Sequence, residues 1–391
     1  MFFVDKPYVS DFFKSTIRDN AIPVVDTDIA KEMGLYRGTK MISESMAIEK
    51  VRESDNPAIY TTSENAIGWI SKHLSFSNLP GNIGLFKDKL RFRELTKSIF
   101  PDFFFKGVCF EDLKNVSFNE LPLPFVIKPS VGFFSMGVYK VSTFEGWVNT
   151  IDSILTEMNQ VKGLYPEEVL STSSFIIEQC INGEEFAVDA YYNSMGEPVI
   201  LNILKHPFSS DNDVSDRVYL SSKEIIEDNL KEFTEFAGKI GNLAGVKNFP
   251  VHIELRRDEK GDLLPVEVNP MRFGGWCTTP DIAFMAYGFN PYLYYYSQKK
   301  PDWPELLKGK EGNIFSIIVL DNSTGIAADE IASFDYEKLV SRFKKPIELR
   351  KIDFQKYPVF GFLFTETKED NFIELKNILD SDLTEFISIK G

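Results

Sequence analysis

Short hydrophobic runs separated by polar segments mark the N-terminal part of the chain. Apolar runs at residues 21–25 and 57–60 predict strands, and the segment 65–74 after Ser63 predicts a helix. Ser63 supports this start because a serine oxygen can accept from the free N–H groups of a first helical turn. Strands that alternate with helices predict a small parallel sheet within residues 1–85.

The central part of the chain contains paired apolar runs that predict two hairpins. The pairs are residues 123–129 with 137–141, and residues 175–181 with 185–192. The second pair flanks Asn182 and Gly183, a dipeptide typical of tight hairpin turns. A basic helix is expected before the first pair, within residues 86–120.

Helical spacing returns in residues 223–245, which predict an amphipathic helix. A third hairpin is predicted over 250–269, and the polar stretch 209–216 predicts a mobile loop. Beyond residue 312, strands and helices alternate again: strands at 314–320 and 359–364, helices near 333–343 and 370–380. We therefore expect three domains: residues 1–85, residues 86–312 with a lid subdomain at about 120–192, and a separate α+β unit at 313–391.

Composition and charge narrow the classes of function. The net charge of -15 argues against a nucleic-acid partner, because phosphate contacts require a surplus of Lys and Arg. An anionic ligand would need a local basic pocket or metal ions. The three cysteines show no CxxC spacing, so a disulfide scaffold or zinc site is not expected. No apolar run is long enough for a membrane helix or a leader peptide, and we expect a cytoplasmic protein.

The third hairpin carries the most informative chemistry. If its turn is the four residues 259–262, Asp258 pairs with Leu263, and counting back places Glu254 opposite Glu267. Asn269 then lies on the same face as Glu267. Facing carboxylates repel, and a divalent cation such as Mg²⁺ would offset that repulsion with oxygen ligands. A solvated pair of surface glutamates is the alternative.

Two further segments suggest a nucleotide. Lys128 ends a strand before a Gly/Ser loop whose N–H groups could surround phosphate oxygens, although such a loop is often only a turn. Glu178 ends the next strand and Glu185 follows the Asn-Gly turn. An adenine needs exposed backbone groups, which residues 179–181 could offer, and a ribose needs a carboxylate. A hairpin with solvent-facing acids is the alternative here.

Together these segments resemble the ATP-grasp superfamily over residues 86–275, with a weaker likeness of 1–85 to its small pre-ATP-grasp domain. The resemblance implies an α/β and α+β protein: an ATP-grasp fold with an N-terminal α/β pre-ATP-grasp domain and a C-terminal α+β unit. The motif Glu267-Val-Asn-Pro-Met-Arg272 is its most specific part.

The resemblance also implies roles for individual residues. Lys89 and Lys128 would contact ATP phosphates, beneath a closing loop at 130–137 that includes Ser135 and Met136. The adenine would be held by Glu178, Gln179, Cys180, Ile181 and Val266, and the ribose by Glu185. Glu254, Glu267 and Asn269 would bind two Mg²⁺ ions, with Mn²⁺ as a substitute. Arg272 would steady an acyl phosphate or a substrate carboxylate.

The sequence departs from the family pattern at two places. Met271 intervenes between Pro270 and Arg272, where many relatives continue directly to arginine. A basic residue after the second strand pair is also expected at the phosphates, and Lys205, His206 and Arg217 compete for that role. His252, two residues before Glu254, is either a partner of the metal ligands or a packed histidine.

The resemblance implies an ADP-forming ligase that activates a carboxylate as an acyl phosphate and transfers it to an amine. Both substrates would be small molecules. Candidates for their pocket are residues 273–279 and the aromatic stretch 287–296, while 313–391 would cap the pocket or form a homodimer interface. The alternatives are a carboxylase or carbamoyl-phosphate type of enzyme, a carboxylate kinase, and a nucleotide-binding protein without catalysis.

Overall fold

The N-terminal residues form a small parallel sheet, as predicted. The computed structural model describes residues 1–131, 137–161, 174–210 and 215–390. The strands are β1 (Phe2–Phe3), β2 (Val24–Val25), β3 (Met41–Ile42) and β4 (Tyr60–Thr61), in the order β3-β2-β1-β4. The helices around them are α1 (Asp11–Asp19), α2 (Asp28–Glu32), α3 (Glu44–Arg52) and α4 (Ile67–His73). Side chains of Ser10, Thr27 and Ser43 cap the first three helices.

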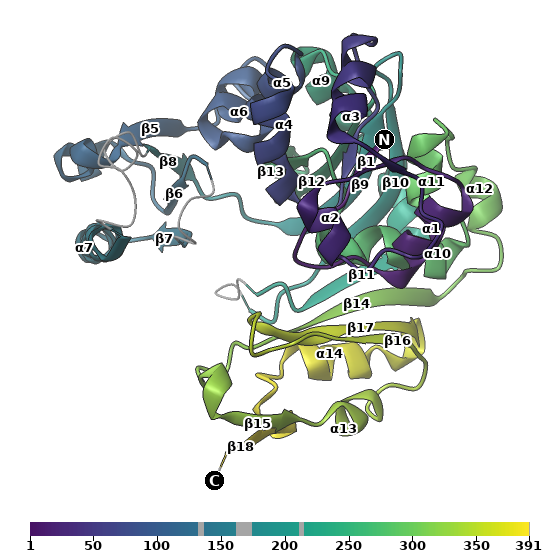
Figure 1. The fold of residues 1–391 in the computed structure, drawn as a ribbon. Coiled ribbons are helices and arrows are strands. Elements are labelled where there is room, and N and C mark those ends of the chain that lie inside the picture. Colours follow the sequence, from purple (N-terminus) through teal and green to yellow (C-terminus); the bar gives the residue numbers. More distant parts are fainter. Residues whose placement is uncertain (132–136, 162–173, 211–214, 391) are drawn as a thin grey trace.

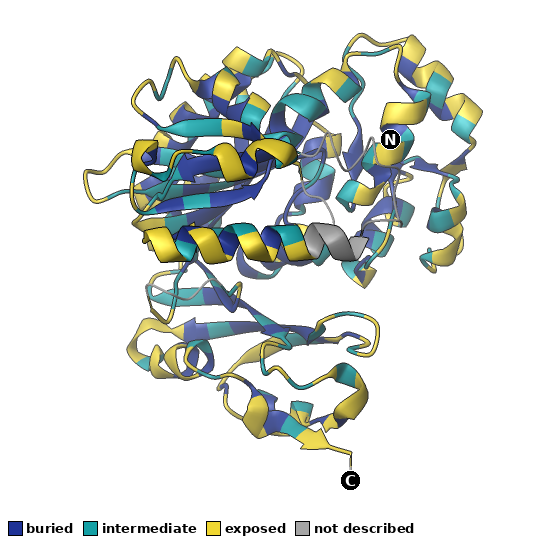
Figure 2. Cartoon of the chain, turned by 90° about the vertical axis from the view of Figure 1, so that its left-hand side faces the viewer, coloured by how far each residue is buried: buried dark blue, intermediate teal, exposed yellow. Residues whose placement is uncertain are grey.

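A second, four-stranded sheet stands apart from the body of the molecule (Figure 1). It contains β5 (Phe105–Cys109), β6 (Phe125–Pro129), β7 (Tyr139–Val141) and β8 (Ser174–Gln179), in the order β5-β8-β6-β7. Helix α7 (Phe144–Val161) covers it, and Figure 2 shows that much of this helix faces solvent. Trp147 and Ile154 of α7 belong to a core of this sheet's own. The predicted hairpin of β6 with β7 is confirmed, with Phe125 opposite Val141.

The third sheet has eight strands and runs through the body of the molecule. Its order is β13-β12-β9-β10-β11-β14-β17-β16. The strands are β9 (Glu184–Tyr192), β10 (Pro198–His206), β11 (Val218–Ser222), β12 (Phe249–Arg257), β13 (Leu263–Pro270), β14 (Asn313–Asp321), β16 (Pro346–Lys351) and β17 (Val359–Lys368). The predicted amphipathic helix is α9 (Lys223–Ala244). It packs on one face, where the rings of Phe186 and Phe233 meet at 5.2 Å.

The hairpin predicted around Asn182 and Gly183 is wrong. Strand β8 pairs with β5 and β6, whereas β9 pairs with β10 and β12 in the eight-stranded sheet. Residues 180–183, the connecting segment, therefore cross from one sheet to the other. Gly183 has φ +116°, and a Cβ there would lie 2.0 Å from the carbonyl oxygen of Arg257. The glycine is thus required by close backbone approach and not by a hairpin turn.

Strands β14, β16 and β17 of the C-terminal residues continue the eight-stranded sheet, and two further strands form a small sheet of their own. Strand β14 pairs with β11 on one side and with β17 on the other. The segment predicted as a helix near 333–343 begins as strand β15 (Ile331–Phe334), which pairs with β18 (Ile387–Ile389), and only then forms the short helix α13 (Tyr336–Val340). Helix α14 (Ile373–Leu379) agrees with the prediction. The domain boundary expected at 312 stays a prediction, and it falls inside this sheet.

The helices not yet described complete the fold. They are α5 (Leu79–Lys87), α6 (Lys89–Thr96), α10 (Thr278–Tyr287), α11 (Pro291–Tyr296) and α12 (Trp303–Leu306). The aromatic stretch 287–296, expected as a pocket wall, lies largely in the core, where Tyr292 and Tyr295 are fully buried. Among the described residues, no helix combines the length and the apolar character that a membrane crossing requires.

Candidate active site

Strands β12 and β13 place the predicted acidic residues face to face. Glu254 is opposite Glu267, and His252 is opposite Asn269. The pairing is as predicted, but the residue count that led to the prediction was wrong. Arg257, and not Asp258, pairs with Leu263, and a bulge next to Glu254 shifts the register by one residue. The longer turn and the bulge offset each other, so the facing carboxylates come out at the predicted positions.

Glu254, Glu267 and Asn269 form an acidic face, and a bound cation would offset its negative charge. Burial and the negative charge of Glu267 raise the pKa of Glu254 to about 7, although the neighbouring His252 opposes the shift. The Asn269 side-chain amide donates to Glu254 Oε1 at 3.2 Å. Within the described part of the chain, no three His, Cys, Asp or Glu side chains converge in the manner of a metal site. The donor set is therefore two carboxylates and one amide, a set that suits Mg²⁺.

Lys89 reaches this face from the start of helix α6. Asp88 caps the helix, and the Lys89 N–H donates to the Ser130 carbonyl at 2.7 Å, which ties α6 to the end of β6. The Lys89 ammonium donates to Glu267 Oε1 at 3.0 Å. Burial alone would raise the pKa of Glu267, but the charge and hydrogen bond of Lys89, together with the charges of Lys128 and Lys87, lower it. The two facing carboxylates thus differ: Glu267 has a cation partner, and Glu254 carries the raised pKa.

Glu178 lies in a buried ion cluster rather than on an open surface. Lys128 Nζ is 2.5 Å from Glu178 Oε1, and Arg93 Nε donates to Oε2 at 2.8 Å. Burial would raise the pKa of Glu178, yet the two cations hold it at about 2. Arg93 also donates to the Pro265 carbonyl, so the cluster links α6, the four-stranded sheet and β13. The sequence reasoning did not identify Arg93.

Glu185 has cationic neighbours on both adjacent strands. It is opposite His206 of β10 and Arg256 of β12. His206 Nδ1 lies 3.0 Å from Glu185 Oε1, and Arg256 Nε donates to Oε2 at 2.7 Å. His206 Nε2 is 3.1 Å from the Ser215 carbonyl. Since both neighbours of the imidazole are acceptors, only the protonated ring can donate to both.

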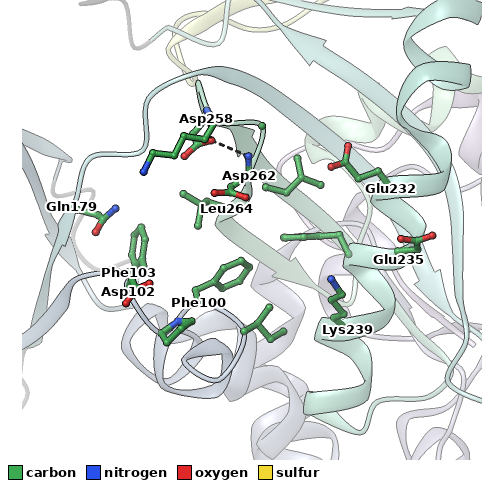
Figure 3. A pocket seen from close by; sticks show the side chains of 16 residues that line it. Phe100, Asp102, Phe103, Gln179, Glu232, Glu235, Lys239, Asp258, Asp262 and Leu264 are labelled. Carbon is green, nitrogen blue, oxygen red and sulfur yellow. Dashed lines mark hydrogen bonds between the residues drawn. The ribbon is translucent and has the colours of Figure 1, made fainter.

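A cavity of about 620 Å³ opens beside the connecting segment, where the four-stranded sheet joins the body (Figure 3). Gln179, expected near the adenine, lies on one side, and Glu235 and Lys239 of α9 lie on the other. Phe100 and Phe103 form an aromatic wall, and the Asp258 carboxylate accepts from the Asp262 N–H at the hairpin tip. The cavity therefore adjoins the segment with which the resemblance associates adenine.

Arg272 is joined to the N-terminal sheet. It donates to Glu64 Oε1 at 3.0 Å, and Glu64 also pairs with Lys87. Met271, the residue that departs from the family pattern, has φ +67° and is fully buried. Its carbonyl accepts from the Thr61 N–H at 2.8 Å, so the extra residue docks strand β4 against the end of β13. The sequence reasoning missed Glu64, because only the tertiary fold brings it to Arg272.

The three basic residues that competed for the phosphates occupy different places. Lys205 pairs with Glu184, and strand alternation puts both on the face of α9, away from Glu254. His206 shares the face of Glu185. Arg217 is buried, with Nη2 2.9 Å from Asp321 Oδ1. We therefore leave Lys205 out of the proposed site.

A second cavity, of about 570 Å³, borders the acidic face. His252, Glu254 and Arg272 line one side of it. Residues 274–276, 278 and 279 also line it, in agreement with the pocket segment expected at 273–279. The C-terminal strands contribute apolar and polar lining residues: Ile317, Val319, Asp321, Asn322, Ser323, Val359 and Phe362.

Asp189, which the sequence reasoning also missed, accepts hydrogen bonds from three residues that line this second cavity. It is fully buried and accepts from His252 Nδ1 at 2.7 Å, from the Gly274 N–H at 2.9 Å and from Thr279 Oγ1 at 2.5 Å. His252 is therefore a hydrogen-bonded neighbour of the acidic face. A charged residue inside the apolar run of β9 was the signal that could have revealed Asp189.

Some expected site residues remain untested. Ser135, Met136 and residues 211–214 of the loop predicted at 209–216 lie outside the described residues. Val266 lies at the register shift of β13, between Pro265 and Glu267. Its place in an adenine pocket stays a prediction.

Residues 121–280 match the family described as the ATP-grasp domain. The solved structures that resemble the whole chain include the following three. An L-amino acid ligase from Bacillus licheniformis has a TM-score of 0.72 and 16% identity, and the alignment covers 100% of this chain and 98% of that chain. A biotin carboxylase from Campylobacter jejuni has a TM-score of 0.63 and 12% identity, with 100% of this chain and 92% of that chain covered. An N5-carboxyaminoimidazole ribonucleotide synthetase from Thermotoga maritima has a TM-score of 0.63 and 15% identity, with 99% of this chain and 98% of that chain covered. None of the curated proteins matches the sequence. At these identities the structural likeness shows the fold.

Proposed function

We propose, on the premise that this chain contains an ATP-grasp domain, that it is an ATP-dependent ligase that joins a carboxylate to an amine. In the proposed reaction, a carboxylate oxygen attacks the γ-phosphorus of ATP, ADP leaves, and an acyl phosphate forms. The amine nitrogen then attacks the acyl carbon, and the bond from that carbon to the phosphate oxygen breaks. The products are an amide, ADP and inorganic phosphate.

One observation carries this proposal: a partly buried pair of facing carboxylates lies between Lys89 and a cavity of about 570 Å³. Glu254 faces Glu267, Lys89 contacts Glu267, and the cavity of about 570 Å³ borders Glu254 and Arg272. Phosphoryl transfer relies on positioning and on charge stabilisation, which such an arrangement supplies. ATP binding alone would not require an acidic face beside a second cavity.

Glu254, Glu267 and Asn269 would hold magnesium, which offsets the negative charge of the ATP phosphates when it is bound. Lys89 and Lys128 would exchange their carboxylate partners for phosphate oxygens. Lys128 would leave Glu178 paired with Arg93 and supply a point charge to a phosphate at the end of β6.

The nucleotide would extend from the connecting segment to the acidic face. We propose that Glu178 and residues 179–181 hold the adenine, with Glu185 at the ribose hydroxyls. The direct contact of Arg256 with both the connecting segment and Glu185 supports this placement, because it brings the two parts together.

The organic substrates would occupy the cavity of about 570 Å³. Arg272 would bind the carboxylate to be activated, because a guanidinium matches a carboxylate with two parallel hydrogen bonds. Trp276 and Phe362 would keep water from the acyl phosphate, since hydrolysis would consume ATP without product.

The test is ADP release with Mg²⁺ and a panel of amino acids and amines, with the products identified by mass spectrometry. We expect release that requires both a carboxylate and an amine, and a product that has lost one water relative to the two substrates. Release at full rate without amine, together with a stable phosphorylated product, would identify a carboxylate kinase and overturn the ligase proposal.

Glu267→Gln tests the acidic face directly. The substitution removes one of the two facing charges and the partner of Lys89, and we expect ADP release to fall by at least about a hundredfold, in line with the loss of a charged group at a reacting centre. Circular dichroism should show a folded protein. Glu259→Gln, at the exposed tip of the same hairpin, is the control and should retain activity. A fully active Glu267→Gln variant would refute the metal assignment.

A further inference from the structure

Arg256 joins two parts of the proposed nucleotide site that belong to different segments of the chain. Its Nη1 donates to the Ile181 carbonyl of the connecting segment at 2.6 Å. Its Nε donates to Glu185 Oε2 at 2.7 Å. One planar guanidinium therefore sets the position of the connecting segment relative to the carboxylate.

Several contacts fix the position of the Arg256 side chain. It lies on β12, directly opposite Glu185 of β9, and its guanidinium lies 5.4 Å from the ring centre of Phe208. The side chain is 29% exposed and that of Glu185 is 13% exposed, so both groups lie at the rim of the buried face. Cross-strand register, an aromatic ring and two acceptors thus determine where the guanidinium lies.

The charge of Arg256 acts on Glu185. Burial would raise the pKa of Glu185, but the hydrogen bond from His206 and the charge of Arg256 outweigh burial and lower it. The carboxylate is therefore held ionised with one oxygen toward each neighbour. An ionised carboxylate has about four acceptor positions, so two remain for the hydroxyls of a ribose.

We propose that Arg256 is a positioning residue for the nucleotide: it fixes Glu185 to receive the ribose hydroxyls and holds the connecting segment at the distance that the base requires. This inference rests on the proposed function, which places adenine at residues 179–181 and ribose at Glu185. Arg256 acts through these groups and does not take part in phosphoryl transfer. Its loss should therefore change nucleotide affinity and sugar recognition more than turnover.

The next residue supplies a matched control. Arg257 points to the other face of β12, where it donates to Asn229 and to Glu232 of helix α9 at 2.7 and 2.6 Å. Arg256→Met and Arg257→Met remove the same side chain from neighbouring positions on opposite faces. Arg256→Lys retains the charge, but an ammonium cannot reproduce the two directed contacts.

The experiment measures the dissociation constants of ATP and 2′-deoxyATP by calorimetry, with Mg²⁺ present and melting curves to confirm folding. A hydrogen bond from the ribose 2′-hydroxyl to the ionised Glu185 would stabilise bound ATP but not bound 2′-deoxyATP. We therefore expect the wild type to bind ATP about tenfold more tightly than 2′-deoxyATP. We expect Arg256→Met to weaken ATP binding by about tenfold and to reduce the preference below about threefold. Arg256→Lys should fall in between, Arg257→Met should match the wild type, and the kcat of Arg256→Met should stay within about threefold.

The possible results distinguish a failure of the role proposed for Arg256 from a failure of the proposed function. If Arg256→Met weakens the binding of ATP and of 2′-deoxyATP equally, the preference for ATP is unchanged. An unchanged or larger preference would mean that Arg256 only holds the connecting segment, and it would overturn the inference. If Arg257→Met has the same effect as Arg256→Met, the inference fails for the same reason. If the wild type binds neither nucleotide while folded, the proposed function fails and takes this inference with it.

Discussion

At the scale of single residues, each cation expected at the ATP phosphates or the substrate already has a carboxylate partner. Lys89 pairs with Glu267, Lys128 with Glu178, and Arg272 with Glu64. Buried charges persist only when they are paired, so the folded protein without ligand must satisfy them internally. Nucleotide and substrate binding would then exchange partners, and the net gain from each new contact would be modest.

Asp189→Asn tests the hydrogen-bond network beside the cavity of about 570 Å³. The amide retains an acceptor for one or two of the three donors, but its NH₂ group then faces at least one donor, which leaves buried groups unsatisfied. We expect the free energy of unfolding, measured with urea, to fall by about 2 kcal/mol. Asp228→Asn, on the exposed side of α9, should change it by less than about 0.5 kcal/mol. Equal effects of the two substitutions would contradict the assignment.

At the scale of elements, the ion cluster of Glu178 fastens helix α6 to strands β6 and β8. The sign of its pH dependence follows from the folded pKa of about 2, which lies below the ordinary value of 4.5. The cluster stabilises the fold fully above pH 4.5, and this contribution disappears as the pH falls toward 2. The shift corresponds to a stabilisation on the order of 3 kcal/mol.

Acid unfolding of the wild type and of Glu178→Gln measures this contribution. The variant leaves Lys128 and Arg93 buried without their carboxylate, and we expect it to be about 3 kcal/mol less stable at pH 7. The difference between the two proteins should shrink as the pH falls from 5 toward 2. The exposed Glu184→Gln is the control, and a constant difference across that pH range would rule out the ion cluster as its source.

Gly183→Ala tests the connecting segment at the same scale. The added Cβ would lie 2.0 Å from the Arg257 carbonyl oxygen at φ +116°, so both clash and backbone strain arise. Gly261→Ala, at φ +89° with open space around the Cβ, adds only strain. We expect a loss of about 1 kcal/mol for Gly261→Ala and at least about 2 kcal/mol more for Gly183→Ala in chemical denaturation. Similar losses would show that the close approach is unimportant.

At the scale of the whole molecule, one eight-stranded sheet connects the acidic face to the C-terminal residues. Strand β11 pairs with β14, and the end of β14 lines the cavity of about 570 Å³. A second link is the buried ion pair between Arg350 of β16 and Asp281 of α10, at 2.8 Å. The C-terminal residues are therefore part of the cavity wall as well as of the sheet.

Arg350→Met tests the second link. It leaves Asp281 fully buried without its cation, and we expect a loss of about 3 kcal/mol in the free energy of unfolding. The double variant with Asp281→Leu should recover much of this loss, because replacing both partners removes the unpaired charge. Arg342→Met breaks an exposed pair with Glu385 and should cost less than about 1 kcal/mol. A double variant as unstable as the single one would contradict the ion-pair explanation.

Sequence reasoning predicted the parts of the fold that depend on local pattern. The small parallel sheet, helix α9 and the hairpin of β12 with β13 all follow from periodicity and turn residues. It failed where two local patterns look alike. An Asn-Gly dipeptide can lie in a hairpin turn or in a segment that joins two sheets, and the local sequence does not reveal which. The pairing of β8 and β9 with strands of different sheets distinguishes the two, and so does the approach of the Arg257 carbonyl to Gly183.

The sequence by itself determined the hairpin of β12 with β13 and the acidic residues that it carries, but Glu254 faces Glu267 as predicted only because the longer turn and the bulge offset each other. The tertiary structure alone decided the partners of that face. Glu64, Arg93 and Asp189 come from segments far away along the chain, and packing brings them to Arg272, Glu178 and His252. Register is a property of neighbouring strands, whereas the balance of buried charge depends on every segment that packs around them.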